Sequence, residues 1–360
     1  MFTGSHNCAT IASLLTDRRP PFWSVMIPTY QPRADYLRQT IESVLQQDAG
    51  AGEMQIEVVD DASPEINVAA LVKTIAGDRV AFSSTQKNLG LAGCWNTCIT
   101  RARGEWVHLL HQDDCVRPGF YNHLRHLIRP QPQAGAAFCG YDYINANSER
   151  IFETAPLQTV AGPIPQPAET LAVKNQVQCP AIVVRRAAYE TVGGFDDQFS
   201  FTLDWEMWIR IAANFPVLYQ PESLASFRIQ TNSETSRLAQ AGETVRDSMR
   251  MIANYPKYIS GERAAAVQAQ AREWVCDLAL QKASAFIAHN QVDYAMAQLY
   301  AGLSYDRRLT AWRSAFILWA KAVKKSRRWL LPPLPLLPAV WFQGQNPDHS
   351  CRPNLPAAKK

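Results

Sequence analysis

Residues 104–114 read Gly104-Glu-Trp-Val-His-Leu-Leu-His-Gln-Asp-Asp114, an apolar run followed directly by a pair of acids. The run from Trp106 to Leu110 is short and nearly continuous in apolar residues, which is typical of a strand covered on both faces. Asp113 and Asp114 follow its carboxyl end, where open α/β sheets bind their ligands. The stretch therefore predicts a buried strand of an α/β sheet that opens into a polar site.

Two adjacent carboxylates at such a position repel each other unless a cation lies between them. A hard divalent ion, Mg²⁺ or Mn²⁺, is the natural partner, and it would bring a diphosphate with it. An isolated Asp-Asp pair is more often a solvated turn, so the metal hypothesis depends on the rest of the chain.

The chain before this stretch alternates between short apolar runs and helical patterns. Strands are predicted at residues 22–27, 56–59 and 79–83. A helix is predicted at residues 36–45, with Asp35 as its cap. Two more are predicted around residues 68–75 and 94–103. Such alternation is typical of an α/β protein with a parallel, doubly wound sheet.

Polar groups follow each of the four strands, and the carboxyl ends of parallel strands lie at one edge of a sheet. These groups are Thr29-Tyr30, Asp60-Asp61, Asn88 to Gly90, and Asp113-Asp114. We therefore expect a polar cleft, in which Asp60 and Asp61 accept hydrogen bonds from a base or a ribose. The alternative for Asp60 is an acid that stabilises a helix N-terminus.

The composition is that of a globular protein, with 47% hydrophobic residues in 360 and a formal net charge of +4. The charge is uneven, because residues 301–360 hold eleven Lys and Arg against two Asp, which gives +9 there and −5 elsewhere. This asymmetry suggests a basic end that meets something anionic.

The eight cysteines are scattered, and neither a CxxC pair nor a His/Cys set has zinc spacing. The N-terminus lacks the long apolar run of a signal peptide. The sequence contains no stretch of about 18 or more apolar residues, so no spanning helix is expected. We therefore expect reduced thiols in a cytoplasmic protein, and no nucleic-acid partner.

Six motifs occur in an order and at a spacing that resemble the family 2 glycosyltransferases of the GT-A fold. They are Ser24-Val-Met-Ile-Pro-Thr-Tyr30 with the helix to Gln47, Val58-Val-Asp-Asp-Ala-Ser63, Asn88-Leu-Gly90, Leu109-Leu-His-Gln-Asp-Asp114, Val184-Arg-Arg-Ala-Ala-Tyr-Glu-Thr-Val-Gly-Gly-Phe-Asp196 and Leu203-Asp-Trp-Glu-Met-Trp-Ile-Arg210. Each motif alone is only moderately specific, and together they cover roughly residues 22–235.

The resemblance implies a GT-A fold, that is, a doubly wound mixed sheet, here with a C-terminal helical appendage. It also implies an inverting transfer of a sugar from a nucleotide-diphosphate sugar, such as a UDP- or dTDP-sugar, to an acceptor hydroxyl. A divalent metal, Mg²⁺ or Mn²⁺, would assist. The acceptor would be a glycan or a lipid-linked molecule in polysaccharide or glycolipid synthesis.

The same resemblance assigns site residues. The expected nucleotide-sugar contacts are Pro28, Thr29, Tyr30, Asp60, Asp61, Asn88, Gly90, Gln112 and Arg228. The expected metal ligands are Asp113 and Asp114, with His111 in place of the first acid of the family's Asp-x-Asp motif. A neutral imidazole can ligate a metal, but His111 could equally contact a ribose or fill the position. The family's His two residues after the Arg is Gln230 here.

Asp204 is the candidate catalytic base, since an acid beside a diphosphate cleft could take the acceptor's proton. The alternative is that Asp204 is the N-cap of the helix it opens. Glu206, two residues further on, is expected to serve the structure. The preceding Gly193-Gly194 pair predicts a tight turn that needs the conformational freedom of glycine.

The expected organisation is a loose leader (1–21), the GT-A domain (22–235), a helical appendage (236–328) and a Pro-rich basic tail (329–360). Alanine-rich residues 264–288 predict paired helices. Further on, an amphipathic helix carries Trp312, Phe316 and Trp319 on one face and basic residues on the other. We expect peripheral contact through residues 311–342 with the inner membrane face. The alternative is that the apolar face packs on the catalytic domain.

Two other functions are compatible with the sequence. His111 and Gln230 depart from the family pattern, which motivates a non-catalytic scaffold protein that binds a nucleotide sugar. A nucleotidyltransferase on a similar sheet is a weaker alternative. That class usually has a Gly-rich phosphate loop near its first strand, and residues 29–35 lack glycine.

Overall fold

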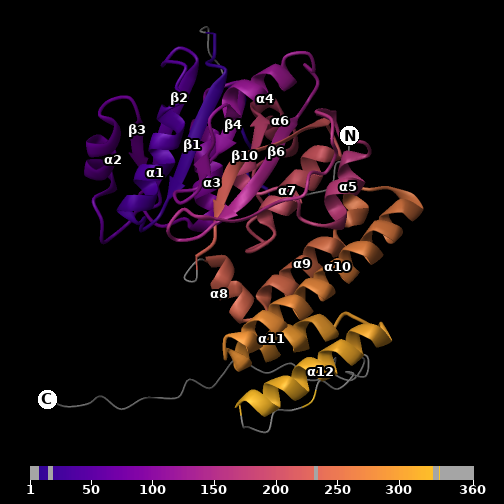
Figure 1. Cartoon of the computed structure of the whole chain (residues 1–360). Helices are drawn as coiled ribbons and strands as arrows, with labels where there is room; N and C mark the ends of the chain where they lie inside the picture. Colours follow the sequence, from indigo (N-terminus) through magenta and orange to yellow (C-terminus); the bar gives the residue numbers. More distant parts are fainter. Residues whose placement is uncertain (1–7, 15–18, 231–233, 327–331, 333–360) are drawn as a thin grey trace, which may run out of the picture.

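The computed structural model describes residues 8–14, 19–230, 234–326 and 332. An α/β part carries helices on both faces of a central sheet, and a stack of helices lies beside it (Figure 1). The Pro-rich tail expected at residues 329–360 lies outside the described residues, apart from Pro332.

The central sheet is mixed, and its main path runs in the order β3-β2-β1-β4-β9-β6-β10-β5. The strands are β1 (Trp23–Thr29), β2 (Met54–Asp60), β3 (Ala81–Ser84), β4 (Trp106–Leu109), β5 (Cys115–Val116), β6 (Ala136–Ile144), β7 (Arg150–Glu153), β8 (Gly162–Pro163), β9 (Ile182–Arg185) and β10 (Val217–Arg228). Strands β1 to β4 pair in parallel, as expected from their alternation with helices. The sheet is not parallel throughout, because β9 runs antiparallel between β4 and β6.

Helices connect and cover these strands. They are α1 (Ala34–Leu45), α2 (Val68–Ala76), α3 (Gly90–Arg101), α4 (Phe120–Ile128), α5 (Pro167–Val173), α6 (Arg186–Val192) and α7 (Leu203–Ala212). The prediction of Asp35 as the cap of α1 is wrong. Arg33 occupies the N-cap position, and Asp35 lies in the first turn and binds the Arg33 guanidinium.

The two faces of β1 pack into different cores, which explains its continuous apolar sequence. Val25 and Ile27 belong to one buried cluster, whereas Met26 between them belongs to the other. Successive side chains of a strand point to opposite faces, so a strand covered on both sides needs apolar residues at every position. The predicted buried strand at Trp106 follows the same rule, and β4 is buried along its whole length.

The N-terminal segment is not entirely a loose leader. Ile11 is buried in the main core, although the expected leader extends to residue 21. The N–H of Gly194 donates to the carbonyl of Ala9 at 2.8 Å, and the Arg186 guanidinium donates to the carbonyl of Ala12 at 3.0 Å. This packing was not predicted, because the Arg186 partner of Ala12 lies 174 residues further along the sequence.

The helical appendage begins with α8 (Glu234–Gln240) and α9 (Glu243–Ala253), and continues with α10 (Gly261–Ala288), α11 (Val292–Leu303) and α12 (Leu309–Ser326). The alanine-rich segment forms part of the single 28-residue helix α10, where paired helices were expected. This helix joins the two parts of the chain, since the Trp274 ring contacts Trp205 of α7 with ring centroids 5.5 Å apart.

Helix α12 packs on α10 and α11 through small residues such as Ala315, which is fully buried. Trp312 and Trp319 of the expected aromatic face are half-buried against the same cluster. Phe316 stays 53% exposed, beside Ile317 at 58%. Among the described helices, none combines the length and apolar content needed to cross a bilayer.

Candidate active site

The loops after β1 and β4 are joined directly at the carboxyl edge of the sheet. The N–H of Tyr30 donates to the side-chain oxygen of Gln112 at 2.8 Å, and the Gln112 amide donates to the Tyr30 carbonyl at 3.2 Å. Pro28 and Thr29 are buried, whereas Tyr30 is 45% exposed. Among the residues expected here to contact the nucleotide sugar, Tyr30 therefore has the accessible side chain. Gln112 fixes the loop that carries Tyr30.

Asp60 and Asp61 lie at this edge, and both carboxylates accept hydrogen bonds from groups of the protein. Asp60 accepts hydrogen bonds from the N–H of Ser63 at 3.0 Å and from its hydroxyl at 2.6 Å. Asp61 accepts from the N–H groups of Leu89 and Gly90 at 2.9–3.0 Å. Asp61 thus anchors the first turn of α3, where a negative charge is favourable, a role that no sequence pattern indicated.

The loop before α3 is closed by a short local contact. The Asn88 side-chain oxygen accepts a hydrogen bond from the N–H of Gly90 at 2.9 Å. Gly90 has a φ of +73°, a conformation that side chains with a Cβ rarely adopt. The expected convergence of Asn88 and Gly90 with Asp61 is thus present.

Asp113 and Asp114 have different environments although they are adjacent. Asp114 is 1% exposed, and one of its oxygens accepts from the N–H of Arg228 at 2.8 Å. Asp113 is partly exposed and accepts a hydrogen bond from the Gln230 side-chain amide. Burial raises the pKa of both carboxyl groups, and the charge of Asp113 raises the pKa of Asp114 further. A positive charge placed nearby would therefore stabilise the ionised form of each carboxyl group.

His111 is a neutral imidazole at ordinary pH, because burial lowers its pKa to about 4. Its ring packs on Trp95 with centroids 4.8 Å apart, and Nδ1 lies 3.6 Å from an oxygen of Asp114. In the described part of the chain, Nε2 of His111 and Oδ2 of Asp114 are buried without a hydrogen-bond partner. Such orphaned atoms are uncommon in a native interior and point to a ligand that the chain alone does not supply.

The residues present fit a divalent ion only in part. The described residues contain no group of three or more His, Cys, Asp and Glu side chains placed to hold a metal. Mg²⁺ is commonly held by one or two carboxylates together with substrate phosphates. The partly exposed carboxylate of Asp113 suits that arrangement, with Asp114 and His111 behind it.

Arg228 binds the protein instead of offering a free guanidinium. Its guanidinium donates to the backbone oxygens of Asp113 and Asn145, and to the side-chain oxygens of Ser148 and Gln39, at 2.8–3.0 Å. The side chain is 2% exposed and lies over the Tyr36 ring. The expected direct contact with the donor thus gives way to a supporting role, in which Arg228 positions the backbone of Asp113.

Asp204 is the second residue of α7 and is 9% exposed. The N-cap of that helix is Thr202, so the alternative interpretation of Asp204 as the cap is wrong. One carboxylate oxygen accepts from the N–H of Trp205 at 2.6 Å. Burial raises the pKa of Asp204 to about 7, against the lowering effect of hydrogen bonds from Trp205 and Asn175. A base with this pKa is suited to accept a proton near neutral pH.

The start of α7 is held from the appendage by Asp247 of α9. This carboxylate accepts hydrogen bonds from the N–H groups of Phe201 and Thr202 and from the Thr202 hydroxyl, at 2.8–2.9 Å. Asp247 is 1% exposed. Sequence patterns did not indicate this residue, because its partners lie about 45 positions away and on another helix.

Glu206 has the structural role expected of it. It forms a buried ion pair with Arg210 at 2.8 Å and accepts a hydrogen bond from the Tyr258 hydroxyl. Arg210 also donates to the carbonyls of Val192 and Gly194, which fixes the turn before α7. Gly193 in this turn has a φ of +85°, as expected of a turn that needs glycine.

A family model described as Glycosyl transferase family 2 matches residues 24–192. An uncharacterized glycosyltransferase of Rickettsia typhi is 23% identical over 220 residues, which cover 60% of this chain and 66% of that protein. The succinoglycan biosynthesis protein ExoO of Rhizobium meliloti is 36% identical over 128 residues. Those residues cover 34% of this chain and 35% of ExoO, so the chain spans only about a third of that relative.

Solved structures of TarS residues 1–349 from S. aureus have the same fold. The complex with UDP-GlcNAc superposes with a TM-score of 0.60 at 15% identity, and covers 85% of this chain and 89% of that chain. The complex with UDP has a TM-score of 0.54 at 16% identity with the same coverage. The mixed sheet and the helices that cover it form a GT-A fold. Residues 24–192, which include the loops after β1, β2 and β4, match the model of glycosyl transferase family 2.

Proposed function

We propose that this protein transfers a sugar from a nucleotide-diphosphate sugar to an acceptor hydroxyl with inversion at the anomeric carbon. The observation that carries the proposal is Asp204, a buried acid at the start of α7 whose pKa is raised to about 7. An ordinary surface acid would be a weak base at neutral pH, whereas this carboxylate accepts a proton more readily.

The reaction is a single displacement. The acceptor oxygen attacks the anomeric carbon while the bond from that carbon to the nucleoside diphosphate breaks, and the acceptor's proton goes to Asp204. Inversion follows, because the nucleophile and the leaving group lie on opposite sides of the carbon. Holding both reactants in line supplies several kcal/mol of the required rate enhancement.

Asp113 is the proposed protein ligand of a divalent cation, Mg²⁺ or Mn²⁺, with Asp114 and His111 beside it. When bound, the cation would neutralise charge that develops on the departing diphosphate. Arg228 supports this site by holding the backbone oxygen of Asp113. Tyr30, at 45% exposure, is the proposed aromatic contact of the donor base.

The relatives support a nucleotide sugar as the donor. TarS, whose fold this chain shares, binds UDP-GlcNAc and UDP, so a UDP-sugar is the first donor to test, followed by a dTDP-sugar. The name of ExoO places that relative in succinoglycan synthesis, which favours a glycan or lipid-linked acceptor in polysaccharide or glycolipid synthesis.

A peripheral contact with the inner membrane face is part of the same proposal. Phe316 and Ile317 of α12 are exposed, and Lys321 and Lys324 of the same helix are exposed as well. An apolar ridge beside basic residues suits an anionic lipid surface, where each cation contributes about 1 kcal/mol.

Release of nucleoside diphosphate from a panel of UDP- and dTDP-sugars, with Mg²⁺ or Mn²⁺ and candidate acceptors, tests the proposal. Wild-type protein should release the product, and Asp204→Asn should lower turnover by about two to four orders of magnitude. The dissociation constant of the donor should barely change, since Asp204 acts on the acceptor. Donor binding with no turnover in wild-type protein over every acceptor would favour the alternative of a non-catalytic scaffold.

A further inference from the structure

A hollow of the molecule lies outside the sheet, within the helical appendage. It has a volume of about 710 Å³ and lies between α10 and the segment that joins α11 to α12. The lining residues are Ala269, Arg272, Glu273, Cys276, Ser304, Tyr305, Asp306, Arg307 and Arg308. Three arginines in so small a set are the feature that needs an explanation.

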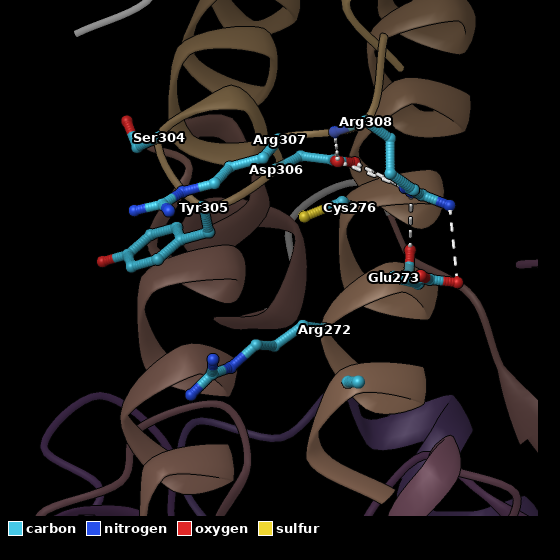
Figure 2. A pocket seen from close by; sticks show the side chains of 9 residues that line it. Arg272, Glu273, Cys276, Ser304, Tyr305, Asp306, Arg307 and Arg308 are labelled. Carbon is cyan, nitrogen blue, oxygen red and sulfur yellow. Dashed lines mark hydrogen bonds and ion pairs between the residues drawn. The ribbon is translucent and has the colours of Figure 1, made fainter. Parts of the chain in front are cut away.

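One of the three arginines is fully engaged in the protein. Arg308 forms ion pairs with Asp306 at 2.8 Å and Asp277 at 2.6 Å, and approaches Glu273 at 3.8 Å. Figure 2 shows the Arg308 side chain turned toward Asp306 and Glu273. Arg308 therefore pairs with the acids of the pocket, Asp306 and Glu273, and the cluster forms one of the pocket's walls.

The other two arginines keep their charge available. Arg272 and Arg307 are exposed, and neither forms an ion pair with any residue in the described ranges. Figure 2 shows both side chains extending to the same side of the pocket, together with the Tyr305 ring. Tyr305 is 47% exposed, so its hydroxyl is a further donor at this face.

The thiol in the pocket is not suited to chemistry. Cys276 is buried and donates to the carbonyl of Gly302 at 3.4 Å. Burial raises its pKa to about 12, so the thiol stays protonated near neutral pH and is a poor nucleophile. The pocket therefore has the composition of a binding site and lacks that of a catalytic one.

We propose that Arg272, Arg307 and Tyr305 form a second binding site, which takes a phosphoryl group carried by a lipid headgroup or by a soluble phosphate ester. Two guanidinium groups supply planar sets of N–H donors that match phosphate oxygens, and charge-assisted hydrogen bonds of this kind are the strong ones. The Tyr305 ring gives an apolar or sugar moiety next to the phosphate a surface to pack on.

This site is separate from α7, the helix that carries Asp204. Arg272 lines the pocket, whereas Trp274, two residues further along α10, contacts Trp205 of α7. Two residues in a helix are about 200° apart around its axis, so the pocket and the contact with α7 lie on nearly opposite faces of α10. A ligand in the pocket therefore leaves the donor cleft open, and its binding can be measured without turnover.

The test is a titration of the full chain by calorimetry with inorganic phosphate and with glycerol 3-phosphate, with UDP at saturation to fill the donor cleft. A parallel arm measures co-sedimentation with vesicles of phosphatidylcholine alone, or with about one third phosphatidylglycerol, an anionic fraction large enough to attract basic residues. The variants are Arg272→Gln with Arg307→Gln, and Arg103→Gln with Arg129→Gln as the matched control. Arg103 and Arg129 are exposed arginines of the α/β part that do not line the pocket.

We expect saturable binding of at least one probe, weakened about tenfold or more in the pocket variant because two charge-assisted contacts are lost, and unchanged in the Arg103→Gln, Arg129→Gln control. Binding of the soluble esters identifies a soluble source, and binding confined to the anionic vesicles identifies a lipid headgroup. The proposal is overturned if wild-type protein binds no probe. It is also overturned if the pocket variant binds as wild type does, or if the Arg103→Gln, Arg129→Gln control loses as much.

Discussion

Asp247 of α9 accepts hydrogen bonds from both the N–H and the hydroxyl of Thr202, at 2.8 and 2.9 Å. Thr202 is the N-cap of α7, the helix whose second residue is Asp204. The Thr202 hydroxyl thus binds the appendage instead of capping its own helix. The helical appendage therefore fixes the element that carries the proposed base, and its role extends beyond packing.

Asp247→Ala should destabilise the fold and lower turnover together. The change removes the acceptor of the N–H groups of Phe201 and of the buried Thr202, and a buried unsatisfied group costs about 1–3 kcal/mol. The start of α7 should then shift, and with it Asp204. Thermal unfolding and turnover with a UDP-sugar measure the two effects.

Glu243→Ala is the matched control for this prediction, because Glu243 lies on the same helix and pairs with Arg246 at the surface. Its effect on stability should stay within about 0.5 kcal/mol, as is usual for surface substitutions. If Asp247→Ala matched this control in both readouts, the capping contact would have no part in the site.

The pH dependence of turnover should report the pKa of Asp204. A general base must be ionised, and burial raises the pKa of this carboxyl to about 7. kcat/KM should therefore rise about tenfold per pH unit below pH 7 and level off above it. Asp204→Asn should remove this rise along with most of the activity.

Asp197→Asn serves as the control, since Asp197 is an exposed acid in the turn before the same helix. It should keep both the turnover and the pH profile of the wild-type protein. A wild-type profile that is already flat between pH 5 and 8 would assign the base to a group with an ordinary carboxyl pKa.

The sequence predicted the sheet well at strands in which every position needs an apolar residue. β1 and β4 are buried on both faces, so nearly every residue is apolar and the runs are visible without context. The polar loops after β1, β2 and β4 were predicted for the same reason, since a strand ends where the apolar run stops. The antiparallel strand β9 was not predicted, because its direction depends on the long excursion from β6 that includes β7, β8 and α5.

The sequence motifs point to candidate site residues but not to their contacts. Asp204 and Asp113 stand out in motifs, but the partners of Arg228 come from Gln39, Asn145 and Ser148 at positions 80 to 189 residues away. No local pattern encodes such pairings, which arise only when α1, β6 and β10 meet. For the same reason Asp247 and the pocket at Arg272 could not be found before the fold was known.

Asp113→Asn should lower turnover strongly while leaving the fold intact. Arg228 holds the backbone oxygen of Asp113, and that contact does not depend on the side chain. The loss of one charge at the proposed cation site should cost about 3 kcal/mol of transition-state stabilisation, which corresponds to about two orders of magnitude in turnover. Nucleoside diphosphate release and thermal unfolding measure the two parts.

The control is Asp78→Asn, a 94% exposed acid that follows α2. It should behave as wild type in both measurements. Full turnover of a correctly folded Asp113→Asn protein would move the cation site to other residues.

His111→Asp tests whether the imidazole position belongs to the cation site. The new carboxylate would lie close to Asp114, because Nδ1 of His111 is 3.6 Å from an oxygen of that residue. Two buried acids at such a distance repel each other and raise each other's pKa. The variant should therefore unfold at a lower temperature than wild type in the absence of metal.

Added Mg²⁺ should reverse this loss, since a ligand that binds only the native state raises its melting temperature. The Mg²⁺-dependent rise should be larger in His111→Asp than in wild type, and the preference should shift from Mn²⁺ toward Mg²⁺, because imidazole suits transition metals and carboxylates suit Mg²⁺. His111→Asn is the control that changes size without adding charge. An equal metal-dependent rise in wild type, His111→Asp and His111→Asn would mean that His111 only packs on Trp95 and takes no part in holding a cation.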